Sequence, residues 1–310
     1  MSERRRRQAG LVAFVTLCFL GSWFPASVLR LFGVLPATGA LGTRLFAATL
    51  LYAATMGWQP LVATLFVRRW VEAPGQADLG LRPAAPRFSF AGGLGALALA
   101  GVASLLTLAV TLAVGDEPRP PVEAARGVPS PGDAVVLLLA LLGTLALVWV
   151  QAFSEEVGWR GYFLPRAMEA LGRWRGLIVH GLVWGLWYAP VLFFALYGSG
   201  HLPDNLGRSV GFVVSCTLLG MLLGWLRLAS GSLVPVVVAN GTLTLAAGWP
   251  FVVEGVDPGV RSAVFGPAGW LVASGVLLAL WFTKWRETVR LPTPASPVLL
   301  VLSSEERVLH

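Results

Sequence analysis

Charged side chains are scarce in this sequence. They make up 13% of the 310 residues, whereas a soluble domain of this length carries about a quarter. Hydrophobic residues make up 56% of the chain, and its mean hydropathy is +0.72. The shortage of charge excludes an ordinary soluble domain, and the composition is typical of a polytopic membrane protein.

Cysteine and histidine are also rare. Cys18 and Cys216 are the two cysteines, and both fall inside apolar runs. We therefore expect no disulfide, and these residues do not indicate a redox compartment. Of the three histidines, His201 lies in a predicted loop and His310 at the terminus, and neither is assigned a role.

The net charge of +7 does not indicate nucleic-acid binding, because the arginines stand in short clusters between apolar runs. Such clusters set the orientation of a protein in a membrane. They begin with Arg4 to Arg7 and recur on one predicted side of the membrane, so both termini are predicted to be cytoplasmic. The run after Arg7 is too long for a signal-peptide core, and we interpret it as a retained first helix.

Eight apolar runs each come near the roughly 20 residues that a helix needs to cross a bilayer. The sequence therefore predicts an all-α fold, a polytopic transmembrane bundle of about eight helices in the cell membrane. Three spans are expected within residues 1–133, a core within 134–253, and the last span and a tail within 254–310. The predicted spans cover residues 9–32, 43–67, 88–114, 134–164, 175–197, 208–228, 232–253 and 265–283.

The third predicted span is rich in glycine. No strand precedes these glycines and no lysine follows them, so a phosphate-binding loop is excluded. Small residues let helices approach closely in membranes, and we expect these to do so. They are Gly92, Gly93, Gly95 and Gly101.

One charged stretch stands at the end of an apolar run. Glu155, Glu156 and Arg160 follow residues 134–153, in which Gln151 is the one strongly polar side chain. Ionisable residues in or near hydrocarbon are costly and indicate a functional site. Glu156 and Arg160 are four residues apart and can pair on one helix face, whereas Glu155 lies about 100° round the helix. We interpret Glu156 as structural and Glu155 as free for chemistry. The alternative is a charge cluster at the water interface.

Two polar residues on other predicted helices reach a similar depth. Tyr188 lies about 18 Å along the fifth span and Asn240 about 12 Å along the seventh, both entered from the predicted cytoplasmic side. Helix-borne side chains that converge on a bundle interior commonly form a site. Each residue also has a purely structural alternative, since Asn240 with Thr244 can bond a neighbouring helix and Tyr188 can be a packed aromatic. His180 is interpreted first as a buried or interfacial histidine.

These residues lie in motifs that resemble the CPBP family of intramembrane proteases, which includes CAAX prenyl proteases and bacteriocin-processing proteins. The E-E-x-x-x-R motif of the family is matched in full by residues 155–160, and its G-Y-hydrophobic-L-P continuation by residues 161–165. The W-G-L-W-H-x-P motif is matched at 184–187 and 190, with Tyr188 in place of histidine. G-S-L-x-P is matched at 231–235, but Asn240 and Thr244 stand where the following H-x-x-x-N has histidine and asparagine.

The resemblance implies an eight-helix bundle in which a glutamate activates a water in a cavity open to the cytoplasm. Carried over, it makes Glu155 the general base and Glu156 with Arg160 the supporting ion pair. Tyr188 and Asn240 would donate hydrogen bonds to a developing oxyanion. Zinc sites usually gather three or four Cys, His or carboxylate ligands, and the motif histidines are replaced here. We therefore expect no metal and no other cofactor.

Three functions remain open at this point. The first is an intramembrane endopeptidase acting on a membrane-associated peptide or protein, either prenylated or a bacteriocin-type precursor. The second is a catalytically silent scaffold that keeps the cavity of the fold. The third is a proton-coupled transporter, which the absence of inverted repeats disfavours. Membrane lipid is the other expected partner, and nucleic acid is not expected.

Overall fold

A computed structural model of the chain describes residues 3–32, 56–72, 78–114, 131–189, 202–253 and 263–283. All regular structure in these residues is helical, which confirms the all-α prediction. The helices are α1 (Glu3–Leu31), α3 (Gln59–Trp70), α4 (Pro86–Ala113), α5 (Pro131–Glu156), the π-helix η2 (Val157–Phe163), α6 (Leu164–Leu171), α7 (Arg173–Trp187), α8 (Leu202–Ser230), α9 (Val234–Val253) and α10 (Pro267–Phe282).

Three of the described helices are long and apolar enough to cross a membrane, at Arg5–Leu29, Pro86–Ala113 and Leu206–Ser230. Val234–Ala246 and Pro267–Phe282 are shorter apolar helices. These correspond to the first, third, sixth, seventh and eighth predicted spans. The first part of the second predicted span, residues 43–55, lies outside the described residues, as do residues 190–197 of the fifth. The number of crossings and the cytoplasmic position of the termini stay predictions.

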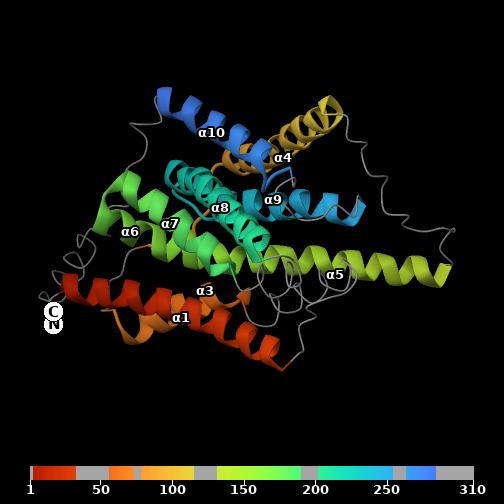
Figure 1. The fold of residues 1–310 in the computed structure, drawn as a ribbon. Coiled ribbons are helices and arrows are strands. Elements are labelled where there is room, and N and C mark those ends of the chain that lie inside the picture. Colours follow the sequence, from red (N-terminus) through yellow and green to blue (C-terminus); the bar gives the residue numbers. More distant parts are fainter. Residues whose placement is uncertain are drawn as a thin grey trace, which may run out of the picture.

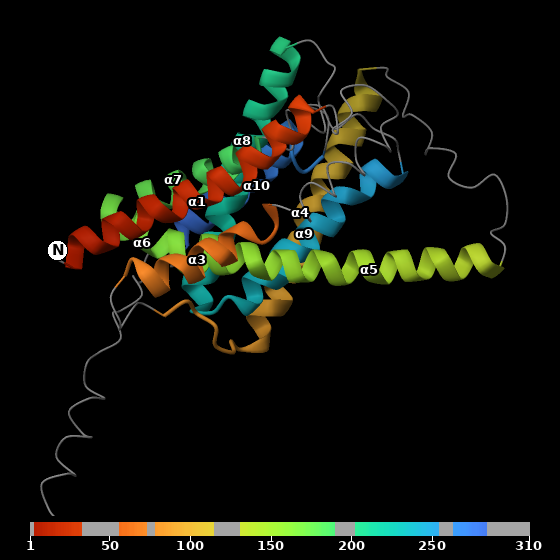
Figure 2. The same ribbon diagram turned by 90° about the horizontal axis from the view of Figure 1, so that it is seen from below.

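The helices lie in layers around α5. In Figure 1, α1 and α3 lie together below α5, while α7, α8 and α9 lie above it and α4 and α10 lie farthest away. Figure 2 shows that the N-terminal part of α5 extends beyond the other helices, whereas its C-terminal end, with η2, lies among them. Packing joins α7 to α8, α4 to α9 and α1 to α3. The charged stretch at the end of α5 is therefore surrounded by helices from both halves of the chain.

The helix that carries the two glutamates does not stop near Pro165, where the sequence predicted its end. It widens into η2 and then continues as α6 to Leu171, with Pro165 in the first turn of α6. A proline inside a helix removes one hydrogen bond and crowds the preceding turn. Just before Pro165, however, the backbone follows the wider turn of the π-helix η2. The amide of Leu164 accordingly donates to the Trp159 carbonyl, five residues back. Single π-turns of this kind occur frequently at functional sites.

Glycines set the distance between helices at the centre of the bundle. A Cβ on Gly181 would lie 2.6 Å from the Thr217 Cα, and a Cβ on Gly220 would lie 2.9 Å from the Gly181 Cα, so α7 and α8 touch through backbone. In α4, Gly92 and Gly93 pack closely against α9, as predicted for that span. The same prediction is wrong for Gly95 and Gly101, since no atom of the described residues lies within 4 Å of a Cβ added there and both glycines are exposed.

The third motif of the sequence forms the turn between α8 and α9. Gly231 has a φ of +66°, a backbone conformation that glycine adopts without steric cost. The Ser232 hydroxyl accepts the Val234 amide at 3.1 Å and donates to the Arg82 carbonyl at 2.5 Å. The Leu233 amide donates to the Gly80 carbonyl. This motif therefore caps α9 and fixes where Asn240 stands along it.

We predict that Gly181→Ala destabilises the protein by ~1–3 kcal/mol, in the range for overpacked cores, because α7 and α8 must move apart. Gly275→Ala, in α10, is the matched control, because an added Cβ there meets nothing within 4 Å. Thermal unfolding of the two purified variants measures the difference. Equal melting temperatures for both variants would contradict the backbone contact between α7 and α8.

Candidate functional site

Glu156 is held in a buried ion pair. The Arg160 Nη1 lies 2.8 Å from the Glu156 Oε1, and both side chains have no exposed surface. The Asn240 Nδ2, from α9, donates to the same oxygen at 2.8 Å. The pairing that the spacing predicted is confirmed, although η2 rather than a regular α-helix spans the interval. Because the carboxylate and guanidinium charges offset each other, this cluster can exist away from water.

Glu155 is buried beside this pair and contacts a different helix. The Tyr188 hydroxyl donates to its Oε1 at 2.5 Å, and the Trp184 Nε1 donates to its Oε2 at 3.2 Å. Both donors belong to the end of α7, so one helix orients the whole carboxylate. The sequence predicted that Tyr188 and Asn240 reach the depth of the glutamates, and the structure confirms it. The structure also shows that the two residues have different partners, because Tyr188 bonds to Glu155 and Asn240 bonds to Glu156.

Trp184 links the two glutamates, and the sequence reasoning did not select it as a site residue. Its indole donates to Glu155, while the Arg160 Cζ lies 4.0 Å from its ring centroid. A cation over an aromatic face at this distance is attracted by the ring quadrupole. The sequence marks Trp184 as the first residue of the W-G-L-W stretch. Only the fold shows that its N–H group contacts Glu155 while the face of its ring contacts Arg160.

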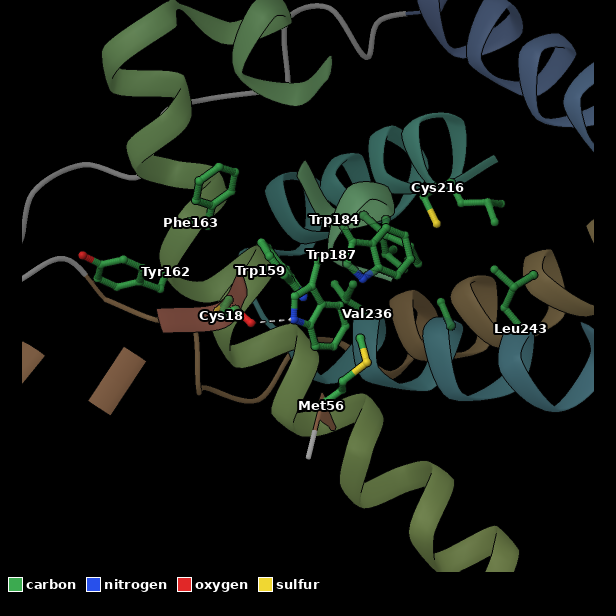
Figure 3. Close-up of a cluster of buried hydrophobic side chains, with 14 of the residues drawn as sticks. Cys18, Met56, Trp159, Tyr162, Phe163, Trp184, Trp187, Cys216, Val236 and Leu243 are labelled. Carbon is green, nitrogen blue, oxygen red and sulfur yellow. Dashed lines mark hydrogen bonds between the residues drawn. The ribbon is translucent and has the colours of Figure 1, made fainter. Parts of the chain in front are cut away.

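An aromatic wall keeps the site apolar on the side of α1. Trp159 packs edge-on against Trp187, with ring centroids 5.5 Å apart, and against Phe14 of α1 at 5.4 Å. Figure 3 shows Trp187 next to Trp184 on α7, with its indole reaching the Cys18 backbone; the Trp187 Nε1 donates to that carbonyl at 3.2 Å. Charges in such surroundings interact more strongly than they do in water.

A second buried ion pair fixes the far end of η2. Arg166 makes two hydrogen bonds to Glu72, at 2.7 and 2.6 Å, and the Tyr162 hydroxyl donates to Glu72 at 2.7 Å. Glu72 lies two residues after the end of α3, between the second and third predicted spans. It was therefore missed, because nothing local distinguishes it from a solvated loop carboxylate. A Cβ on Gly10 would lie 2.9 Å from the Glu72 Oε1, so α1 closes over this pair.

Other polar residues singled out in the sequence stand apart from the glutamates. His180 is fully buried one helical turn before Trp184, with its ring 6.1 Å from that of Phe163, and neither nitrogen has a hydrogen-bond partner among the described residues. Thr244, at the asparagine position of the third motif, is exposed. Within the described part of the chain, the Arg160 Nε and Nη2 and the Glu156 Oε2 also lack partners. The cluster thus retains hydrogen-bonding capacity for a water or a substrate.

The residues present do not fit a zinc ion. The side chains that hold Glu155 are a tyrosine and a tryptophan, and an indole N–H donates hydrogen bonds but offers no lone pair to a metal. Among the described residues, no group of three or more His, Cys, Asp or Glu side chains is placed to hold a metal ion. A protein zinc site usually needs three or four such ligands, so we derive no step through a metal.

The fold and the site define a class of protein. It is a helical, multi-pass membrane protein with two adjacent buried glutamates, one in an ion pair and one held by hydrogen-bond donors from another helix. Residues 137–246 match the family model described as Type II CAAX prenyl endopeptidase Rce1-like. The region that is similar to the Rce1-like family therefore includes the paired glutamates, Arg160, Trp184, Tyr188 and Asn240.

One curated relative supports this assignment. The CAAX prenyl protease 2 of Methanococcus maripaludis is 27% identical to this chain over 85 residues. The aligned region covers 27% of this chain and 31% of the relative. The match thus spans about a third of that protein's length.

We predict that Glu156→Gln destabilises the protein by about 3–5 kcal/mol, because it leaves the Arg160 charge buried and unpaired. Glu169→Gln is the control, since Glu169 pairs with Arg7 at 3.1 Å near the surface, where such pairs contribute about 0–1 kcal/mol. Replacing both Glu156 and Arg160 with glutamine should recover part of the loss. Denaturant or thermal unfolding checks all three variants, and equal losses for Glu156→Gln and Glu169→Gln would contradict the buried pair.

Proposed function

We propose that this protein is an intramembrane endopeptidase of the CAAX prenyl protease type in the cell membrane. Its substrate is a membrane-associated peptide or protein, and the name of the curated relative favours a prenylated C-terminal segment. The proposal rests on the different partners of two neighbouring glutamates. Arg160 neutralises Glu156, while Glu155 accepts hydrogen bonds from two neutral donors, Trp184 and Tyr188.

The reaction that this geometry supports is addition of water to a peptide carbonyl. Glu155 accepts a proton from the water, and the oxygen of that water forms a bond to the carbonyl carbon. The carbon–nitrogen bond then breaks, and the proton passes from Glu155 to the leaving nitrogen. The products are a carboxylic acid and an amine, which become a carboxylate and an ammonium group when the acid proton passes to the amine, so atoms and charges balance without an added reagent.

The neighbours of Glu155 have roles that follow from their bonds. Trp184 and Tyr188 hold the carboxylate in one orientation, and a base held in place contributes more than a mobile one. The Tyr188 hydroxyl, which donates to Glu155, can also turn towards an oxyanion as the proton arrives on Glu155. Asn240 acts through Glu156, since its amide donates to that carboxylate. This revises its expected role as an oxyanion donor.

We predict that Glu155→Gln lowers the rate of substrate cleavage by about 100-fold or more, the range that general-base groups contribute. Stability should change little in comparison, because the glutamine carbonyl oxygen can accept from the Trp184 indole while its amide group donates to the Tyr188 hydroxyl. Purified protein in bilayers would be offered prenylated CAAX peptides and bacteriocin-type leader peptides, with products followed by mass spectrometry.

Glu169→Gln serves as the control, because that carboxylate lies on α6 and pairs with Arg7. It should cleave at the wild-type rate. Equal cleavage by wild type and Glu155→Gln would remove Glu155 from the mechanism, and no cleavage of any peptide by the wild type would reject the endopeptidase function.

A catalytically silent peptide-binding scaffold is the second candidate. It is favoured by one observation, that a tyrosine and an asparagine occupy the positions of the motif histidines and bond directly to the two glutamates. In this case the glutamates stabilise the bundle, and a substrate-like peptide would bind without being cleaved.

Restoration of the motif distinguishes the two candidates. The triple variant carries Tyr188→His, Asn240→His and Thr244→Asn, and it should fold with a loss of ~1–3 kcal/mol, as for ordinary core changes. We predict that the wild type already cleaves its substrate and that the variant is equal or slower, because Tyr188 already positions Glu155. Cleavage by the variant alone would identify the wild type as the silent scaffold, and cleavage assays with and without added divalent metal measure the outcome.

A further inference from the structure

An apolar groove runs along the outer face of α1. It has a volume of about 510 Å³ and is open along its length. Its walls are formed by Ala9, Val12, Ala13 and Thr16 of α1 and by Phe66 of α3. Gly10 lies on a neighbouring face of α1 and faces Glu72 and Tyr162 in the interior. Because empty apolar space loses the dispersion contacts that packed atoms make, a groove of this size in a bilayer is filled by hydrocarbon.

Arginines stand at one end of this groove. A helix turns about 100° per residue, so Arg5 lies on the same face as Ala9 and Val12, one turn before them, and Arg6 lies at its edge. Arg5 and Arg6 are both exposed. Arg7 points to another side, where it pairs with Glu169 of α6 at 3.1 Å.

The α3 wall carries charge at the same end. Arg69 and Trp70 follow Phe66 by three and four residues and therefore share its face. The Phe66 and Trp70 rings lie 4.8 Å apart, and the Arg69 Cζ lies 6.0 Å from the Trp70 ring centroid. Trp70 is exposed, and tryptophan is enriched at the level of lipid headgroups. Glu72, two residues later, lies against Gly10 of α1, so the C-terminal end of α3 and the N-terminal end of α1 coincide.

We infer that this surface binds an anionic phospholipid. One acyl chain occupies the groove, and the phosphate lies between Arg5 and Arg69, with Trp70 at the boundary between chain and headgroup. The guanidinium groups match a phosphate because they present paired N–H donors. A zwitterionic lipid can fill the same groove, but its choline or ethanolamine group meets a second positive charge. The charge at the groove's end therefore selects the headgroup, and this inference does not depend on the proposed function.

The test is lipid retention by the full-length protein in detergent. Phosphatidylglycerol and phosphatidylcholine with identical acyl chains are titrated separately and in competition, and bound lipid is counted by native mass spectrometry. The wild type is expected to retain one phosphatidylglycerol in preference to phosphatidylcholine. Arg5→Gln with Arg69→Gln should reduce that preference at least tenfold, since each basic residue near a membrane surface contributes about fivefold.

Two further variants separate the parts of the site. Val12→Trp fills the groove and should lower retention of both lipids, whereas Leu20→Trp, at an exposed position of α1 outside the groove, should not. Arg87→Gln is the control for charge, because Arg87 is exposed at the start of α4. All these positions are at the surface, and unfolding temperatures verify that the variants fold.

Equal retention of the two lipids by the wild type would overturn the inference, as would an unchanged preference in the Arg5 and Arg69 double variant. If Val12→Trp leaves phosphatidylglycerol retention intact but abolishes cleavage of a prenylated peptide, the groove belongs to the substrate and the lipid site is rejected.

Discussion

The structure of the site depends on the buried pair between Glu156 and Arg160. A lone carboxylate or guanidinium at this depth would be strongly unfavourable, but the 2.8 Å contact and the additional bond from Asn240 make the cluster nearly neutral. Arg160 lies in η2, so the pair also holds the π-helix against α9. The guanidinium in turn packs on Trp184. Three helices thus meet through one charge pair, which fixes the position of everything around it.

The surroundings of Glu155 also depend on this arrangement. Arg160 pairs with Glu156, whereas Glu155 accepts hydrogen bonds from the Trp184 indole and the Tyr188 hydroxyl, both of them uncharged. A carboxylate held by neutral donors in an apolar bundle is suited to accept a proton, whereas one neutralised by an arginine is not. Adjacent residues of the same type therefore have different partners because they lie on different faces of one helix.

Local patterns in the sequence predicted the helices and the pair, but not how the faces of different helices meet. The spacing of Glu156 and Arg160 is a local property, and it was confirmed. By contrast, the contact of Asn240 with Glu156 rather than Glu155 depends on how α9 is rotated, which the Gly231 and Ser232 turn sets from a distance. The contact between Glu72 and Arg166 could not be predicted either, because it depends on how the end of α3 packs against α6. The continuation of the helix past Pro165 depends on the π-helix η2, which no residue pattern in the sequence predicted.

In the proposed mechanism, Glu155 activates water directly and forms no bond to the substrate. Single-turnover cleavage in H₂¹⁸O, with enzyme in excess over a prenylated peptide, tests this mechanism by the mass of the new carboxylate. One ¹⁸O atom is expected in the product of the first turnover, because the oxygen of water adds to the carbonyl carbon. An unlabelled first product, with ¹⁸O found in the Glu155 side chain instead, would contradict it, because the carboxylate would then have formed a covalent acyl intermediate.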